Sequence, residues 1–226
     1  MTEATILRIE EYIDHTNLKQ DALPKDIENL CNEAKAYNFA AVCINPCFVQ
    51  LAKEILKNSN CKVCTVVGFP LGQSTTDVKV FEAQKAVVDG ADEIDMVINI
   101  GRLKNGDFDY VEEDIREVTN AVKAIDNKVC VKVIIECCLL DEDQKKTATL
   151  ITERAKADYV KTSTGFSLSG ATVEDIKLMK KTAGERLRIK GAGGIRDYKT
   201  AKSIIDAGAD RIGTSNGVAI VKESMA

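Results

Sequence analysis

The chain has 226 residues, of which 45% are hydrophobic and 29% are charged, with three prolines and no tryptophan. This is the composition of an ordinary globular protein, which excludes a disordered or collagen-like chain. The formal net charge of −4 provides no general attraction to nucleic acid or to an anionic membrane. Any anionic ligand therefore has to be held by a local group of cations or backbone amides.

The chain begins MTEATILRIEEYIDHTNLK, in which charges interrupt every apolar stretch, so we expect no signal peptide. No apolar run reaches the roughly 18 residues that a transmembrane helix needs. We therefore expect a cytoplasmic protein whose eight cysteines are reduced thiols packed as small hydrophobic groups. We expect neither a Cys61–Cys64 disulfide nor a zinc site that adds Cys43 and Cys47, because these cysteines fall in or beside buried strand segments.

Short apolar, β-branched segments alternate along the chain with longer segments of helical periodicity. We predict strands at residues 12–16, 40–44, 64–67, 93–98, 129–135, 159–161, 187–190 and 211–213. Apolar residues at 27, 30, 31 and 34, and again at 111, 115, 118 and 122, have the spacing of buried helix faces. Eight buried strands alternating with helices in a chain of this length predict an α/β fold, a single-domain (β/α)8 TIM barrel spanning residues 1–226.

An Ala-Asp pair precedes three of the predicted strands, at residues 91–92, 157–158 and 209–210. Glycine precedes two of these pairs, as Gly90 and Gly208, and glycine is favoured just after a helix ends. We interpret the three segments as one kind of helix-to-strand turn, built three times.

Four predicted strands carry charges, which buried parallel strands otherwise exclude. They are Glu93 and Asp95 on one face of their strand, Lys132 and Glu136 on one face of the next, and Lys161 and Lys190 at the ends of two later strands. Active sites of this architecture lie at the carboxyl ends of the strands, so we expect these side chains at the barrel mouth. A single such charge would equally well fill the barrel as an ion pair, whereas two terminal lysines beside an aspartate favour a functional site.

Two lysines at successive strand ends favour amine chemistry. A second ammonium about 5 Å away, at an effective dielectric near 20, repels the first by roughly 3.3 kcal/mol and lowers its pKa by about 2.4. We predict that Lys161 or Lys190 is an amine that reacts with carbonyl compounds, and the residues alone leave open which one. The only histidine, His15, is expected to form a structural hydrogen bond with Asp14 beside it rather than to act as a base.

Glycine-rich turns follow the last predicted strands, at residues 191–194 and 213–217, and each leads into a helical segment. Backbone amides at such turns bind anions, and barrels often bind phosphate with the loops after strands seven and eight. The spacing matches neither GxGxxG nor a P-loop, which argues against a nucleotide-binding fold. Residues 162–165 add hydroxyls and a glycine beside Lys161. The pattern predicts an amine that faces a phosphorylated carbonyl compound.

These segments resemble those of the deoxyribose-phosphate aldolase family over essentially the whole chain. The resemblance rests on IDHT (13–16), AVCINP (41–46), GFPLG (68–72), EIDMVI (93–98), VKVIIE (131–136), VKTSTGF (160–166), KGAGGIR (190–196) and RIGTS (211–215). It implies a class I aldolase that reversibly cleaves 2-deoxy-D-ribose 5-phosphate to D-glyceraldehyde 3-phosphate and acetaldehyde, without a metal or other cofactor. The chain departs from the family pattern at Asn17, Phe166, Cys137, Gly191 and Asn216.

The resemblance also assigns roles to individual residues. It implies that Lys161 forms the Schiff base, that Lys190 perturbs Lys161 and assists proton transfer, and that Asp95 belongs to the proton relay. The substrate contacts that it implies are Asp14 and Thr16 near the sugar, and Gly165, Gly193, Gly194, Gly213 and Ser215 at the phosphate.

Two alternatives remain open at this stage. One is another Schiff-base barrel aldolase or transaldolase that acts on a different phosphosugar, and the other is a non-catalytic phosphosugar-binding barrel. The presence of Lys161, Lys190 and Asp95 together favours catalysis. The resemblance implies a small phosphosugar as ligand and a homo-oligomer, dimer or tetramer. From the net charge and the lack of a long apolar run, we expect no nucleic acid or membrane as partner.

Overall fold

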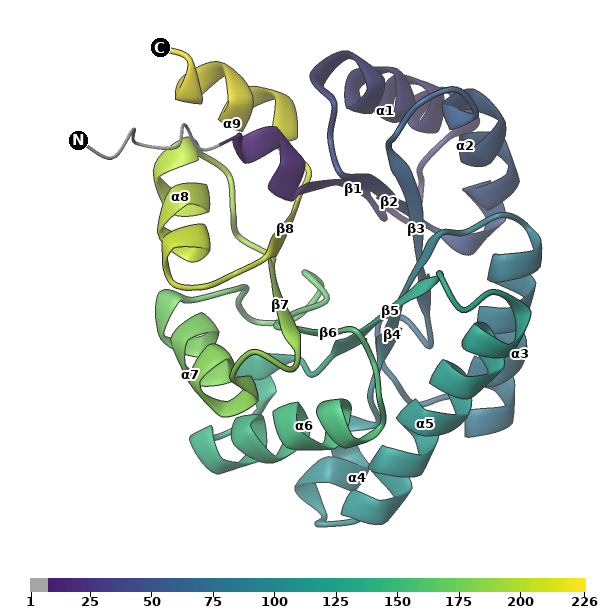
Figure 1. The fold of residues 1–226 in the computed structure, drawn as a ribbon, viewed down its shortest axis with the longest axis vertical. Coiled ribbons are helices and arrows are strands. Elements are labelled where there is room, and N and C mark those ends of the chain that lie inside the picture. The colour runs from purple at the N-terminus through teal and green to yellow at the C-terminus, as the bar shows by residue number, and fades with distance from the viewer. Residues whose placement is uncertain (1–7) are drawn as a thin grey trace.

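Eight parallel strands, hydrogen-bonded in chain order, close into a barrel (Figure 1). The computed structural model describes residues 8–226, so residues 1–7, which begin the charged N-terminal segment, lie outside it. The strands are β1 (Ile13–Asn17), β2 (Ala41–Ile44), β3 (Lys62–Val67), β4 (Glu93–Val97), β5 (Cys130–Ile134), β6 (Tyr159–Lys161), β7 (Arg188–Ala192) and β8 (Arg211–Thr214). Because β8 pairs with β1, the sheet has no free edge. The predicted TIM barrel is confirmed.

Helices form a ring outside the strands (Figure 1). They are α1 (Pro24–Tyr37), α2 (Val49–Leu56), α3 (Thr76–Val88), α4 (Ile100–Lys104), α5 (Phe108–Ile125), α6 (Glu142–Arg154), α7 (Val173–Ala183), α8 (Tyr198–Asp206) and α9 (Gly217–Ser224). Within residues 8–226, short 3₁₀ helices precede β1, as η1 (Ile9–Tyr12), and follow β2 and β5, as η2 (Pro46–Phe48) and η3 (Cys137–Leu139). The apolar residues that predicted helix faces are buried on α1 and α5. Among residues 8–226, no helix combines the length and apolarity needed to cross a membrane.

All eight predicted strands are present, with ends that differ from the prediction by two residues at most. The largest differences are at β3, which begins at Lys62, and at β7, which continues to Ala192. Register explains both, since Lys62 pairs with Ala41 and Ala192 pairs with Gly213. Lysine and glycine have low strand propensity, so the local sequence predicts shorter strands at these two places. Hydrogen bonding to the neighbouring strands extends them.

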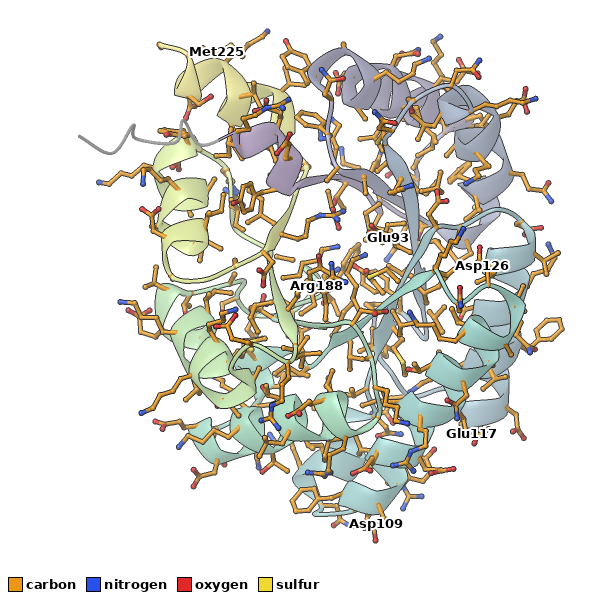
Figure 2. The ribbon with its side chains drawn as sticks, in the orientation of Figure 1. Glu93, Asp109, Glu117, Asp126, Arg188 and Met225 are labelled. Carbon is orange, nitrogen blue, oxygen red and sulfur yellow. The ribbon has the colours of Figure 1, made fainter. Side chains whose placement is uncertain are left out.

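The two faces of the barrel strands differ in polarity. Ile94 and Met96 of β4 pack in the hydrophobic layer between strands and helices, and alternation turns Glu93 and Asp95 to the barrel interior. Figure 2 places Glu93 among the strands and Glu117 on the outer helical layer. The interior is apolar beside β2 and β3, where Cys43 and Cys64 pack, and strongly charged from β4 round to β8.

The recurring Ala-Asp pair forms the same contact three times, which confirms the predicted repeated turn. The carboxylates of Asp92, Asp158 and Asp210 each accept the backbone N–H at the start of the preceding strand, from Val63 at 2.9 Å, Val131 at 2.8 Å and Ile189 at 2.8 Å. The glycines before two of the pairs, Gly90 and Gly208, have φ of 109° and 114°, which favours glycine. These contacts tie neighbouring strands together at their amino ends.

Candidate active site

Seven charged side chains meet inside the barrel. They are the carboxylates of Asp14 (β1), Glu93 and Asp95 (both β4), and the cations of Lys132 (β5), Lys161 (β6), Lys190 (β7) and Arg211 (β8). We call these seven residues the charge cluster. No side chain in the charge cluster is more than 12% exposed, and four cations face three carboxylates. The charge cluster therefore carries one unbalanced positive charge when every group is ionised.

Asp95 lies at the centre of the charge cluster. Its Oδ2 accepts hydrogen bonds from Nζ of Lys161 and of Lys190, each at 2.7 Å, and its Oδ1 accepts one from Lys132 at 2.8 Å. The thiol of Cys64 also donates to Oδ1, at 3.1 Å. Burial disfavours the charged form of Asp95, but attraction to the three ammonium groups outweighs it and holds its pKa well below the usual range. Asp95 is thus an anion that three lysines share, two of them through the same oxygen.

Lys190 is fully buried between two carboxylates. Its Nζ pairs with Asp14 as well as with Asp95, and Asp14 in turn accepts from Nε of Arg211 at 2.8 Å. Burial favours the neutral amine, but attraction to Asp14 and Asp95 outweighs it and raises the pKa of Lys190 above its ordinary value. Repulsion between two lysines predicts a lowered pKa, and for Lys190 that prediction is wrong because it leaves out the carboxylates around the amine.

A cavity of about 530 Å³ opens beyond the carboxyl ends of β1, β6, β7 and β8. Lys161 is the one member of the charge cluster in the wall of this cavity, as far as residues 8–226 are concerned. Lys132 and Lys190 are fully buried beneath it. Lys161 therefore borders the cavity on one side and contacts Asp95 on the other.

Six of the seven predicted substrate contacts line the same cavity. These are Thr16, Gly165, Gly193, Gly194, Gly213 and Ser215. Asp14 is not in the cavity wall, because its buried carboxylate faces Lys190 and Arg211. At Gly193 the backbone has φ of 81°, and a Cβ there would lie 2.9 Å from Cα of Gly170. Only glycine allows this close approach of two loops without strain.

Two cations in the cavity wall, Lys19 and Arg196, were not identified from the sequence. Neither forms an ion pair with any other residue that the structure describes, and Arg196 is exposed. Arg196 ends the motif KGAGGIR, and its position directly after the glycine turn could have indicated that it lies near the cavity. Helix α9 begins at Gly217, two residues after Ser215, and adds the positive end of its dipole. The part of the cavity beside the loops after β7 and β8, with Arg196 and the start of α9, is suited to an anion.

His15 forms a structural hydrogen bond, but with Glu33 rather than with Asp14. Its Nε2 lies 2.7 Å from the Glu33 carboxylate, and its ring packs 5.0 Å from that of Phe39. Successive residues of a strand point to opposite faces, so Asp14 faces the barrel interior and His15 faces outward toward α1. This alternation explains why the predicted Asp14 contact is wrong.

Two sets of thiols and carboxylates have ligand atoms within 4.8 Å of one another. One set is Cys43, Cys64 and Asp95, and the other is Asp14, Cys64 and Glu93. In both sets the carboxylates already bind lysine or arginine, so a metal ion would have to displace a bound cation. Cys47 is exposed and belongs to neither set.

The fold and the site together define a barrel enzyme that presents a lysine amine to a small anionic ligand. The family model for the DeoC/LacD family of aldolases matches residues 9–225. The chain belongs to this family.

The similarity to individual family members extends over nearly the whole chain. A deoxyribose-phosphate aldolase from Natranaerobius thermophilus is 58% identical over 218 residues, which cover 96% of this chain and 98% of that protein. One from Caldanaerobacter subterraneus subsp. tengcongensis is 55% identical over 221 residues, or 98% and 95% of the two chains. Among solved structures, the aldolase QR15 has a TM-score of 0.91 with 43% identity, covering 96% of each chain. Deoxyribose phosphate aldolase from Aeropyrum pernix has a TM-score of 0.88 with 32% identity, covering 95% and 89%.

Proposed function

We propose that the chain catalyses the reversible cleavage of 2-deoxy-D-ribose 5-phosphate to D-glyceraldehyde 3-phosphate and acetaldehyde. The relatives that are named deoxyribose-phosphate aldolase match this chain over nearly their full length. The observation that carries the proposal is the position of Lys161, which contacts Asp95 at 2.7 Å and borders the cavity. An amine in this place can condense with an aldehyde that enters the cavity.

Lys161 has to lose a proton before its nitrogen can attack a carbonyl carbon. Since the charge cluster has four cations and three carboxylates, the loss of one proton leaves its charges balanced. Lys132 and Lys190 each pair with more than one carboxylate, whereas among residues 8–226 Lys161 pairs with Asp95 alone, which it shares. Removing the charge of Lys161 therefore breaks fewer ion pairs than removing the charge of Lys132 or Lys190.

The proposed reaction begins when Lys161 attacks C1 of the open-chain sugar and water leaves, which gives an iminium ion. A base removes the proton of the C3 hydroxyl, the C2–C3 bond breaks, and its electron pair moves into the iminium to form an enamine. Protonation at C2 and hydrolysis then release acetaldehyde and restore the amine. We assign the proton transfers to Asp95 and Lys190, acting through water, because their hydrogen bond places a carboxylate and an ammonium beside Lys161.

The phosphate group is proposed to bind at the glycine-lined end of the cavity. Gly165, Gly193, Gly194, Gly213 and Ser215 line the cavity, and Arg196, which follows the glycine turn after β7, supplies positive charge. Thr16 lines the cavity and is assigned to the sugar. For Asp14 we propose an indirect role, in which it holds Lys190 beneath the cavity instead of touching the substrate.

Borohydride trapping tests the proposal. With 2-deoxyribose 5-phosphate, mass spectrometry is expected to find a reduced two-carbon adduct on Lys161, and Lys161→Met is expected to give neither adduct nor acetaldehyde. An adduct that forms only with another phosphosugar would assign a different aldolase reaction. Equal phosphosugar binding by wild type and Lys161→Met, with no adduct in either, would assign a binding protein.

We also propose that the chain forms a homo-oligomer. Helix α3 exposes a row of apolar side chains on one face, Val78, Phe81 and Val88, which are between 53% and 71% exposed. The Aeropyrum pernix relative is described as tetrameric. Light scattering is expected to show a multimer for wild type and a smaller mass for Phe81→Lys. An unchanged mass would exclude this face as the interface.

We also propose that the protein is located in the cytoplasm. All eight cysteines are free thiols, and Cys43 and Cys64 are register partners on neighbouring strands without being joined. A reducing compartment maintains thiols in this state. Fractionation of cells is expected to recover the activity with cytoplasmic markers.

A further inference from the structure

Glu136 is a buried carboxylate that the proposed reaction does not use. It follows β5, is 2% exposed, and pairs with no cation in the part of the chain that the structure describes. Its φ of 55° lies in the left-handed region, which strains a residue with a side chain and which glycine adopts freely. A turn alone would be better served by glycine. The carboxylate itself therefore needs an explanation.

Apart from a long contact with the thiol of Cys138, at 3.8 Å, the hydrogen bonds of this carboxylate come from one residue of the loop that follows β6. The backbone N–H of Thr164 donates to both oxygens of Glu136 at 3.3 Å, and the Thr164 hydroxyl donates to Oε2. The same hydroxyl oxygen accepts the backbone N–H of Phe166 at 3.1 Å. Next to Glu136, the N–H of Cys137 donates to the carbonyl of Thr162 at 2.8 Å. The loop at residues 162–166 is thus fastened to the end of β5.

This loop separates two cavities. Thr164 and Phe166 line the cavity that Lys161 borders, and both also line a second cavity of about 350 Å³ that has Glu136 in its wall. The ring of Phe166 meets that of Phe69 edge to face, with centroids 5.3 Å apart. If the bonds from Glu136 were lost, the loop would have open space to move into on the far side.

We propose that Glu136 is a positioning residue that fixes the loop at residues 162–166 and thereby selects phosphorylated substrates. The inference rests on the proposed function, in which Gly165 borders the phosphate. Lys161 precedes the loop and is held by β6 pairing and by Asp95, so loosening the loop displaces Gly165 and leaves the amine in place. Loss of the Glu136 contacts therefore weakens phosphate binding and spares the covalent chemistry.

A matched pair at Thr164 tests the proposal. Thr164→Val is isosteric but removes the hydroxyl that joins Glu136 to Phe166, whereas Thr164→Ser retains it. For 2-deoxyribose 5-phosphate, we expect the KM of Thr164→Val to be about tenfold above that of Thr164→Ser, which corresponds to one hydrogen bond to a charged group. For unphosphorylated 2-deoxyribose, we expect the same KM for both variants. The kcat is expected to differ little between them on either sugar.

Substitutions of Glu136 provide a second test. Glu136→Gly relieves the backbone strain, so it is expected to fold, yet to raise KM for the phosphorylated sugar alone. Glu136→Gln retains an acceptor oxygen and is expected to recover most of that loss. If wild type cleaves the phosphorylated sugar, then equal changes of KM for both sugars, or no change of KM, would overturn the role of Glu136. The proposed function would stand in that case. Failure of wild type to cleave that sugar would overturn the proposed function and this inference with it.

Discussion

Lys161 and Lys190 are register partners on β6 and β7, and both donate to one oxygen of Asp95 at 2.7 Å. Their two nitrogens therefore lie no farther apart than twice that distance. One carboxylate oxygen holds both ammonium groups beside each other, where repulsion alone would drive them apart. Removal of a proton from one of them then relieves repulsion without breaking up the charge cluster.

Asp95→Asn is expected to lower kcat by about 10²- to 10⁴-fold, the usual contribution of a positioned proton-transfer group. The amide also leaves three buried ammonium groups without their shared anion, so the free energy of unfolding is expected to fall by about 3–5 kcal/mol. Steady-state kinetics and urea unfolding measure the two effects. A variant that retains wild-type kcat would remove Asp95 from the mechanism.

The free energy of unfolding is expected to decrease above about pH 9. Burial raises the pKa of the Cys31 thiol to about 11 and those of Cys61 and Cys130 to about 12. In the unfolded chain these thiols ionise near about 8.5, so the unfolded state loses protons first. The contribution of these thiols to the free energy of unfolding is therefore fully present below their unfolded pKa. It declines as the pH rises toward their pKa values in the folded protein. Urea unfolding from neutral to alkaline pH measures the slope, and Cys61→Ala is expected to make it shallower.

Asp158→Ala is expected to destabilise the fold by about 1–3 kcal/mol and to leave kcat unchanged. The substitution leaves the N–H of Val131 without its carboxylate acceptor and removes the partner of Lys123. Asp158→Asn retains one acceptor oxygen and is expected to lose less than half as much. Thermal and urea unfolding check the stability. A large loss of kcat would show that this turn, at the amino ends of the strands, influences the opposite end of the barrel.

Arg196→Ala is expected to raise KM for 2-deoxyribose 5-phosphate about three- to tenfold, which is the range for losing an exposed charge-assisted contact. Arg196 lines the cavity and has no ion-pair partner among residues 8–226. Unphosphorylated 2-deoxyribose is expected to show no change, and Arg196→Lys to show a smaller one. An equal rise of KM for both sugars would place Arg196 away from the phosphate.

Local sequence pattern predicted the strands and singled out Asp95, Lys161 and Lys190, because charged side chains are rare in buried parallel strands. It did not reveal Arg211, which begins β8 and reaches Asp14 only after β8 pairs with β1. The contact between Glu136 and Thr164 likewise joins two connections whose meeting depends on the register of β5 and β6. Contacts of this kind are set by tertiary geometry, so no local pattern contains them.

The pairing of β8 with β1 has a consequence for the newly made chain. Asp14 emerges near the beginning of synthesis, whereas its partners Lys190 and Arg211 emerge near the end. No shorter piece from the N-terminal side contains the complete set of charges, so enzymatic turnover cannot start before the last strand docks. The rate at which acetaldehyde release recovers during refolding would therefore report the rate of barrel closure.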